Sequence, residues 1–159
     1  MNDQPRTAPE TGRLGEIGLS NFAPYLMNRI MGRYNASLRD QMAGLGLSTP
    51  KMRTLAVLSV IEGPLIRDLA VYAVVEQSTL SRALDQLATE GLIRREPDAD
   101  DSRGTRVFIT GTGRAAFETL WPHMAAVYAD MFRGIADEER HAFVETLQKM
   151  LANIRRHAF

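Results

Sequence analysis

The chain has 159 residues, of which 45% are hydrophobic and 24% are charged, so its composition is that of a globular protein with a substantial core and excludes general disorder. Its 19 basic and 19 acidic side chains give a formal net charge of zero, so nucleic-acid binding has to be judged from where the basic residues lie. Cysteine is absent, which excludes disulfides, thiolate metal sites, cysteine nucleophiles and thiol-based redox sensing.

The sequence gives no sign of membrane insertion or secretion. No segment approaches the roughly 18 consecutive apolar residues of a membrane-spanning helix. The first ten residues lack the apolar core of a signal peptide. We therefore expect a cytoplasmic protein.

The N-terminal part divides into an arm and a long helix. Residues 1–19 contain several prolines and glycines without an apolar period, which predicts a flexible arm. Ser20 and Asn21 are candidate caps for a helix whose apolar residues recur at helical spacing. We expect Gly44 and Gly46 to end this helix.

The middle of the chain alternates helical and strand-like patterns. In chain order we expect a helix from Thr49-Pro50 to about Gly63, a short helix over 66–72, a turn at 73–75, a helix over 76–90, and strands over 92–96 and 105–109. The polar segment 97–104 between the strands is typical of a hairpin tip. A short helix, a turn, a second helix and a two-stranded ribbon predict a winged helix–turn–helix.

The C-terminal third is helical again. A broad apolar stripe surrounds Pro122, where we expect a kink, and Gly134 should interrupt the helix. Three acidic residues at 137–139 suit the start of a last helix, and Arg155 and Arg156 suit its end. The predicted fold class is mainly α with a small β-wing. Its DNA-binding lobe spans 49–110, and a helical dimerisation region spans 20–48 and 111–159.

The helix over 76–90 has one apolar and one polar side. Leu80, Leu84 and Leu87 share a side that should face the core. The other side carries small hydroxyls, an arginine and amide or carboxylate groups, namely Ser78, Thr79, Ser81, Arg82, Asp85, Gln86 and Thr89. Hydroxyl groups can contact phosphates and an arginine can span guanine O6 and N7, as a helix in the major groove requires. A solvated amphipathic helix without DNA contacts would show the same pattern.

The predicted ribbon is rich in charge of both signs. Arg94, Arg95, Arg103 and Arg106 lie within its strands and tip, where a wing would follow the DNA backbone. An arginine at the tip fits the negative potential of a narrow minor groove. Acidic Glu96, Asp98, Asp100 and Asp101 share the segment, and we expect them to orient the arginines or brace the turn. A hairpin of mixed surface charge with no DNA role remains an alternative.

Across about residues 20–157 the chain resembles the MarR family of transcriptional regulators. The resemblance rests on residues 77–87, 90–95 and 97–103, and then on Ile109-Thr110 and Gly113. Its most specific part is Asp101 and Arg103 in the wing, followed six residues later by the Ile-Thr pair. The resemblance implies a triangular dimer that binds DNA with Arg103 in the minor groove and the polar side of the helix in the major groove.

The sequence therefore predicts a sequence-specific DNA-binding regulator, a repressor released by a small ligand. The candidate DNA-contacting residues are Gln77, Ser78, Thr79, Ser81, Arg82, Gln86, Arg94, Arg95, Arg103 and Arg106. Asp101 is expected to support the wing. Ser102 departs from the family, which often has a second wing arginine at this position. The loss of one phosphate contact should reduce the slope of log DNA affinity against log salt concentration by about one unit per subunit.

A homodimer on double-stranded DNA is the expected assembly. The stripes on the first and the last two helices hold more apolar side chains than a lobe of this size can cover, and self-association would bury the surplus. A two-fold dimer presents its recognition helices to successive major grooves about 34 Å apart, so the operator should be palindromic. Packing of these helices on one another within a monomer is the alternative.

Small aromatic or phenolic effectors are what the resemblance implies as ligands. The candidate ligand-binding residues are Phe22, Tyr25, Arg29, Tyr34 and Met52, since aromatic and methionine surfaces with one arginine suit an aromatic carboxylate. The same residue types at helical spacing are also typical of ordinary core packing.

Other classes of function find little support. His123, His141 and His157 include no pair at the i, i+4 spacing that a helix needs for two metal ligands, so we expect no metal. The sequence has no glycine-rich phosphate loop after a strand, no nucleophile elbow and no zinc motif, so we expect neither a cofactor nor an enzyme. A winged-helix module that binds protein instead of DNA would typically lack the hydroxyl-and-arginine face and the tip arginine.

Overall fold

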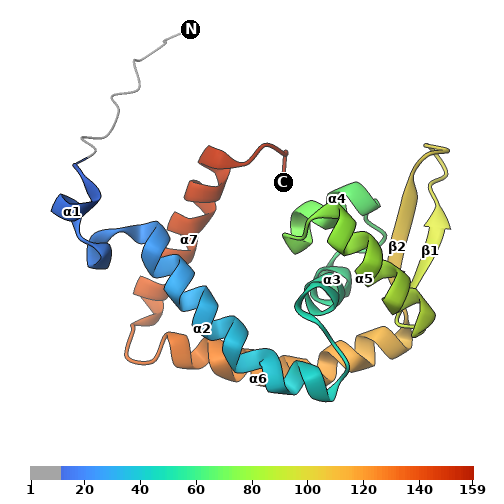
Figure 1. Cartoon of the computed structure of the whole chain (residues 1–159), viewed down its shortest axis with the longest axis horizontal. Helices are drawn as coiled ribbons and strands as arrows, with labels where there is room; N and C mark the ends of the chain where they lie inside the picture. Colours follow the sequence, from blue (N-terminus) through green and yellow to red (C-terminus); the bar gives the residue numbers. More distant parts are fainter. Residues whose placement is uncertain (1–11) are drawn as a thin grey trace, which may run out of the picture. The chain divides into compact units, whose positions relative to one another are not determined.

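The computed structural model describes residues 12–159 (Figure 1). Two compact units make up the chain, Met1–Thr49 and Pro50–Phe159, and each is described by itself below. Of the predicted arm over residues 1–19, the first eleven lie outside the described residues.

The first unit contains a short helix α1 (Leu14–Ile17), a 3-10 turn η1 (Leu19–Asn21) and the long helix α2 (Ala23–Gly44). Within the described residues, secondary structure begins at Leu14, before the expected end of the arm. The cause is local, because the Glu16 carboxylate accepts a hydrogen bond of 3.0 Å from the Arg13 backbone N–H and caps α1.

The predicted caps of the first long helix were wrong. Phe22 occupies the N-cap position of α2, and Asn21 instead donates its side-chain amide to the Ile17 carbonyl at 3.0 Å. The predicted end was right, since α2 ends at Gly44 and Gly46 has a φ of 65°, a backbone conformation that glycine adopts without strain.

The second unit holds the predicted helices and strands in the predicted order. They are α3 (Thr49–Val60), α4 (Ile66–Ala73), α5 (Gln77–Thr89), β1 (Ile93–Pro97), β2 (Thr105–Ile109), α6 (Gly111–Met131) and α7 (Asp137–Ile154). In Figure 1, α5 lies between α4 and the hairpin of β1 and β2. The predicted fold class, mainly α with a two-stranded wing after a helix–turn–helix, is confirmed.

The turn between α4 and α5 contains no glycine. Val74 occupies it in the left-handed region, with φ 53° and ψ 52°, and its side chain is 76% exposed. A β-branched residue rarely adopts this conformation. Arg53 of α3 stabilises the turn by donating a hydrogen bond of 3.2 Å to the Val74 carbonyl.

The predicted leucine side of α5 faces the core of the second unit. Leu80, Leu84 and Leu87 are each at most 1% exposed. The large side chains buried with them come from α3, α4, β2 and α6, namely Leu55, Leu69, Val107 and Leu120. Because every third or fourth residue of α5 is buried in this way, its intervening polar residues are left at the surface.

The wing is an antiparallel pair in which Ile93 lies opposite Ile109 and Pro97 opposite Thr105. Its base is tied to the loop that precedes α4, because the Val107 N–H donates to the Pro64 carbonyl at 3.1 Å. We use "wing" below for residues 93–109, including the tip between the two strands.

Helix α6 starts directly after the wing. The Thr110 hydroxyl accepts a hydrogen bond of 3.0 Å from the Gly113 N–H and caps the helix. Gly113 has no room for a side chain, since a Cβ there would lie 2.0 Å from the Leu92 carbonyl oxygen. Pro122 lies inside α6, which continues to Met131, and no described helix is long and apolar enough to span a membrane.

Candidate nucleic-acid interface

The polar side of α5 forms an exposed surface, as the sequence predicts. Its exposed residues are Gln77, Ser78, Thr79, Ser81, Arg82, Asp85, Gln86 and Thr89. The Thr89 hydroxyl donates to the Asp85 carbonyl at 2.9 Å, so this hydroxyl is used within the helix. Ser78, Thr79, Ser81 and Arg82 near the start of α5 are exposed side chains that can contact an external partner, whereas Leu80 is buried.

Arg82 is exposed, and no hydrogen bond or ion pair among residues 12–159 involves its guanidinium. All five N–H donors of this side chain are therefore available to a partner outside the chain. An arginine in this state can contact the O6 and N7 acceptors of a guanine or a phosphate group.

Arg95 joins the wing to α5. Its Nη2 atom lies 2.8 Å from Oδ1 of Asp85, which is on the exposed side of α5. The guanidinium of Arg95 is 34% exposed and its charge is balanced by this carboxylate. The structure thus brings together two residues that the sequence placed on separate elements.

Arg94 lies on the opposite face of the same strand. It forms an ion pair with Glu96, and its guanidinium carbon lies 4.3 Å from the centre of the Phe108 ring. Phe108 is its partner across the two strands. This stacked arrangement is favourable for an arginine and holds the side chain against the wing.

Arg106 connects the wing tip with the loop before α4. Its Nε donates to Asp98 at 2.6 Å and its Nη1 donates to the Gly63 carbonyl at 2.7 Å. The Asp98 side chain is only 6% exposed. The hydrogen bond from Arg106 lowers the pKa of Asp98 below its usual value, and backbone N–H groups of the tip add to this effect. The expectation that an acidic residue of the tip orients an arginine is confirmed for this pair.

Asp101 and Gly104 shape the tip itself. Oδ1 of Asp101 accepts a hydrogen bond of 2.9 Å from the Arg103 N–H, and the Asp101 carbonyl accepts one of 2.8 Å from Gly104. These contacts are those of a tight turn closed by an aspartate. The guanidinium of Arg103 projects from this turn, is exposed, and has no partner within the described part of the chain.

The arginines therefore fall into two groups. Those of the wing strands, Arg94, Arg95 and Arg106, are each paired with a carboxylate of the same lobe. Arg82 on α5 and Arg103 at the tip are unpaired among residues 12–159. Because an unpaired exposed guanidinium keeps its charge and its donors, this second group is the one available to bind an external anion.

Sequence reasoning missed one contact that holds α5 in place. Nζ of Lys51 in α3 lies 2.7 Å from Oε1 of Glu90, the residue that caps the end of α5. The Lys51 side chain is only 4% exposed. The two residues are 39 positions apart and neither has a distinctive sequence context, so only the fold brings them together.

The predicted ligand-binding residues lie in different places. Arg29 donates a hydrogen bond of 2.9 Å to the Tyr25 hydroxyl one turn earlier in α2, and Phe22 precedes this helix. Tyr34 follows further along α2, and burial raises the pKa of its hydroxyl. Met52 lies in α3, in the second unit, and is 4% exposed.

The described residues offer no metal centre. No group of three or more His, Asp or Glu side chains among residues 12–159 is arranged to hold a metal ion. The chemistry available at the surface of α5 and the wing is anion recognition by guanidinium and hydroxyl donors.

Comparison with known proteins agrees with this geometry. A family model described as the MarR family matches residues 45–104, which run from the end of α2 to the wing tip. A transcriptional regulator of the MarR family from Silicibacter pomeroyi, solved as a crystal structure, is 59% identical in sequence and covers 93% of this chain and 100% of its own. The two structures superpose with a TM-score of 0.89.

Two curated relatives are similar at lower identity. The HTH-type transcriptional repressor IacR of Pseudomonas putida is 24% identical over 136 residues, which cover 86% of this chain and 79% of IacR. The HTH-type transcriptional repressor YetL of Bacillus subtilis is 28% identical over 123 residues, which cover 76% of this chain and 70% of YetL.

Proposed function

Because the chain belongs to the MarR family of DNA-binding transcriptional regulators, we propose that it grips an operator with α5 in the major groove and the wing at the minor groove. The predicted family is confirmed by this membership, and with it the expectation that the protein is not an enzyme. The proposal concerns which residues contact DNA and how the protein is assembled on it.

The observation that carries the proposal is the pair of unpaired guanidiniums on adjacent exposed elements. Arg82 reads base edges or phosphates from α5, and Arg103 enters the minor groove from the wing tip. The hydroxyls of Ser78, Thr79 and Ser81 contact phosphates beside the helix N-terminus. Arg95 and Arg106 act as positioning residues, since their carboxylate partners hold the wing against α5 and the loop before α4.

The protein acts as a homodimer in this proposal. Large apolar side chains of α6 and α7 are exposed in the isolated chain, including Trp121 (54%), Phe143 (43%), Leu151 (57%) and Ile154 (79%). Burial of such side chains stabilises an assembly by about 25 cal/mol per Å² of apolar area. A two-fold dimer places two copies of α5 about one DNA turn apart, which requires a palindromic operator.

Repression with release by a small molecule is the regulatory mode we propose. Support for repression comes from IacR and YetL, which are both named repressors. For a small aromatic acid, the hydrogen-bonded Arg29 and Tyr25 on α2 provide a cation beside an aromatic ring. Phe22, Tyr34 and Met52 stay predicted ligand residues.

Footprinting on the promoter next to the protein's own gene should locate the operator, and fluorescence anisotropy should then compare the operator with random DNA. We expect Arg82→Ala to weaken operator binding by roughly 1–3 kcal/mol and to reduce the discrimination between the two DNAs. Arg103→Ala should weaken operator binding and reduce the slope of log affinity against log salt concentration by about one unit per subunit.

Arg156→Ala is the matched control, because this exposed arginine near the C-terminus lies outside the proposed interface. Operator binding that is unchanged by both Arg82→Ala and Arg103→Ala would contradict the proposal and favour a winged-helix module that binds protein. Sedimentation should show a dimer at micromolar concentration, and a monomer would contradict the assembly.

A further inference from the structure

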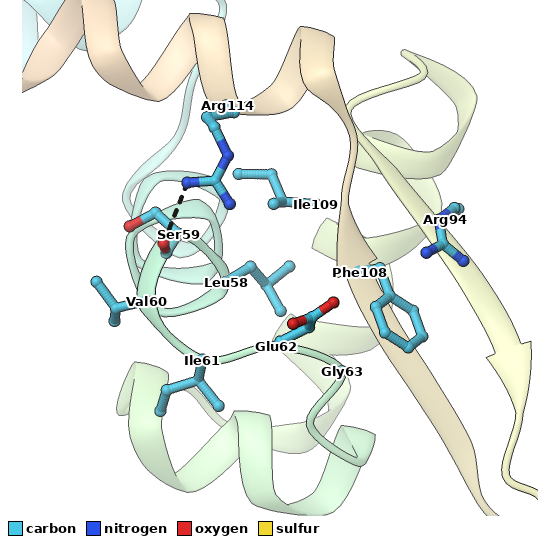
Figure 2. Close-up of a pocket in the computed structure, with 10 residues that line it drawn as sticks. All are labelled: Leu58, Ser59, Val60, Ile61, Glu62, Gly63, Arg94, Phe108, Ile109 and Arg114. Atoms are coloured by element: carbon cyan, nitrogen blue, oxygen red, sulfur yellow. Dashed lines mark hydrogen bonds between the residues drawn. The ribbon is translucent and has the colours of Figure 1, made fainter.

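A hollow of about 300 Å³ lies at the base of the wing, on the face that carries Arg94 and Phe108 (Figure 2). Its walls come from the end of α3 and the loop after it, residues 58–63, and from Phe108 and Ile109 of β2. Arg114, in the first turns of α6, closes the remaining side. The volume is at the lower end of the range for small-molecule sites, so it suits a molecule of a few heavy atoms.

Part of the lining of the hollow is apolar, and this part is called its floor below. Leu58, Phe108 and Ile109 are its apolar lining residues on α3 and β2, and Leu58 is 2% exposed. The Arg94 guanidinium lies over the Phe108 ring, and Gly63 lies so close to the ring that an added Cβ would be 2.6 Å from its Cε1 atom. These two neighbours restrict where the ring can lie before any ligand arrives.

Two opposite charges face this floor without contacting each other. Arg114 donates one hydrogen bond of 3.1 Å to the Ser59 carbonyl, and its other N–H groups have no partner within residues 12–159. Glu62 points its carboxylate toward the hollow in Figure 2 and takes part in no ion pair of 4.0 Å or less in the described chain. The charge of Arg94, by contrast, is balanced by Glu96.

We propose that this hollow binds a small zwitterion, an α-amino acid with an apolar side chain. Its carboxylate would pair with Arg114, its ammonium group with Glu62, and its side chain would cover Leu58, Phe108 and Ile109. A simple organic acid would bring its charge close to the Glu62 carboxylate, and a simple amine would bring its charge close to Arg114. Only a ligand that carries both charges satisfies both side chains at once.

The loop that lines the hollow is hydrogen-bonded to the wing. Gly63 in its wall accepts the hydrogen bond from Arg106, which also holds Asp98 near the wing tip. The neighbouring Pro64 carbonyl accepts the Val107 N–H of β2. A ligand that shifts the loop at residues 61–64 therefore acts on the wing, and by linkage DNA and ligand change each other's affinity by the same factor.

Isothermal titration calorimetry on the full-length protein without DNA tests the site. The probes are L-leucine, 4-methylpentanoate, which lacks the amine, and 3-methylbutylamine, which lacks the carboxylate. We expect L-leucine to bind with a dissociation constant of about 1 mM or lower, and each truncated probe to bind at least about tenfold more weakly, since one charge pair is lost. An absence of saturable leucine binding up to about 10 mM, or tighter binding of a truncated probe, would overturn the proposal.

Glu62→Gln keeps the size of the side chain and removes its charge. This exposed change should weaken leucine binding at least about tenfold and leave binding of 4-methylpentanoate no weaker than before. Glu145→Gln, an exposed change on α7, is the control and should leave leucine affinity unchanged. Equal leucine affinity in Glu62→Gln and in the wild type would show that Glu62 does not bind the ligand and would contradict the proposal of a zwitterion.

The link from the hollow to the wing rests on the proposed function, and a second measurement keeps the two apart. L-leucine at a concentration that saturates the wild type should change the operator dissociation constant of the wild type by about fivefold or more. The same concentration should change the operator dissociation constant of Glu62→Gln less, because less leucine is bound. Bound leucine that leaves operator affinity unchanged would overturn the link while the site stands. Failure to bind any operator would instead contradict the proposed function, and the calorimetry would still decide the site.

Discussion

Arg95 of the first wing strand and Asp85 of α5 are joined by an ion pair of 2.8 Å, so the two elements that we propose contact DNA are linked to each other directly. The carboxylate lies on the same exposed side of α5 as Arg82. A negative charge on a surface proposed to face DNA is unfavourable unless a cation balances it, and Arg95 does so. The pair fixes the wing relative to the recognition helix.

Asp85→Asn should therefore affect DNA binding more than stability. Exposed ion pairs contribute only about 0.2–1 kcal/mol to folding, and this pair is largely exposed. We expect a small change in the free energy of unfolding and a faster dissociation from the operator, because the wing loses its fixed position. A double-mutant cycle with Arg95→Gln, measured by urea unfolding and by stopped-flow dissociation, checks both effects. Additive effects on dissociation would show that the pair does not couple the two elements.

Val74→Asn should stabilise the protein. Val74 has a φ of 53°, which costs an L-residue roughly 1–2 kcal/mol, and asparagine adopts this conformation more readily. Its side chain is exposed, so no packing is lost on substitution. We expect the free energy of unfolding to rise by about 1 kcal/mol in urea denaturation. Val74→Ala, which removes the branch but keeps a Cβ, should gain less. A loss of stability in the asparagine variant would contradict this explanation.

Gly113→Ala should destabilise the junction between the wing and α6. An added Cβ would lie 2.0 Å from the Leu92 carbonyl oxygen, and backbone has to move to relieve this contact. We expect a loss of about 1–3 kcal/mol or more, as for other overpacked sites. Gly111→Ala in the same helix turn is the control, since nothing lies within 4 Å of a Cβ there. Thermal unfolding of both variants compares them, and equal melting temperatures would show that the backbone yields easily.

The pairing of Asp98 with Arg106 should make the wing sensitive to acid. The folded-state pKa of Asp98 is lowered, chiefly by the hydrogen bond from Arg106. Its contribution to stability is therefore fully present above the unfolded-state pKa of about 3.9 and is lost as the pH falls through the lower folded-state pKa.

Asp98→Asn tests this contribution. It should be less stable than the wild type at neutral pH, and the difference in melting temperature should shrink as the pH is lowered below about 4. Asp100→Asn, a neighbouring exposed substitution that removes the same charge outside the Arg106 pair, is the control. A difference in melting temperature between the wild type and Asp98→Asn that stays constant with pH would contradict the stabilising role of the Asp98–Arg106 pair.

Much of the lobe could be predicted because its signals are local. Leucines at helical spacing fixed which side of α5 is buried, and the alternation of turn residues and strand residues located both wing strands within one residue. Helix starts were less certain, because capping depends on single hydrogen bonds. Glu16 therefore began a helix inside the predicted arm, and Phe22 stood where Ser20 or Asn21 was expected.

The sequence by itself determined the order of elements, the leucine side of the recognition helix and the presence of arginines at the wing. Only the tertiary structure decided which arginines of the wing and of α5 have unpaired guanidiniums, because pairing depends on residues far apart in the chain. Arg95 pairs with Asp85, and Arg106 pairs with Asp98 and Gly63, while the guanidiniums of Arg82 and Arg103 form no hydrogen bond or ion pair with another described residue. The sequence of a segment shows how much charge it carries. Ion pairs form only over a few ångströms, so the partner of each charge depends on the fold.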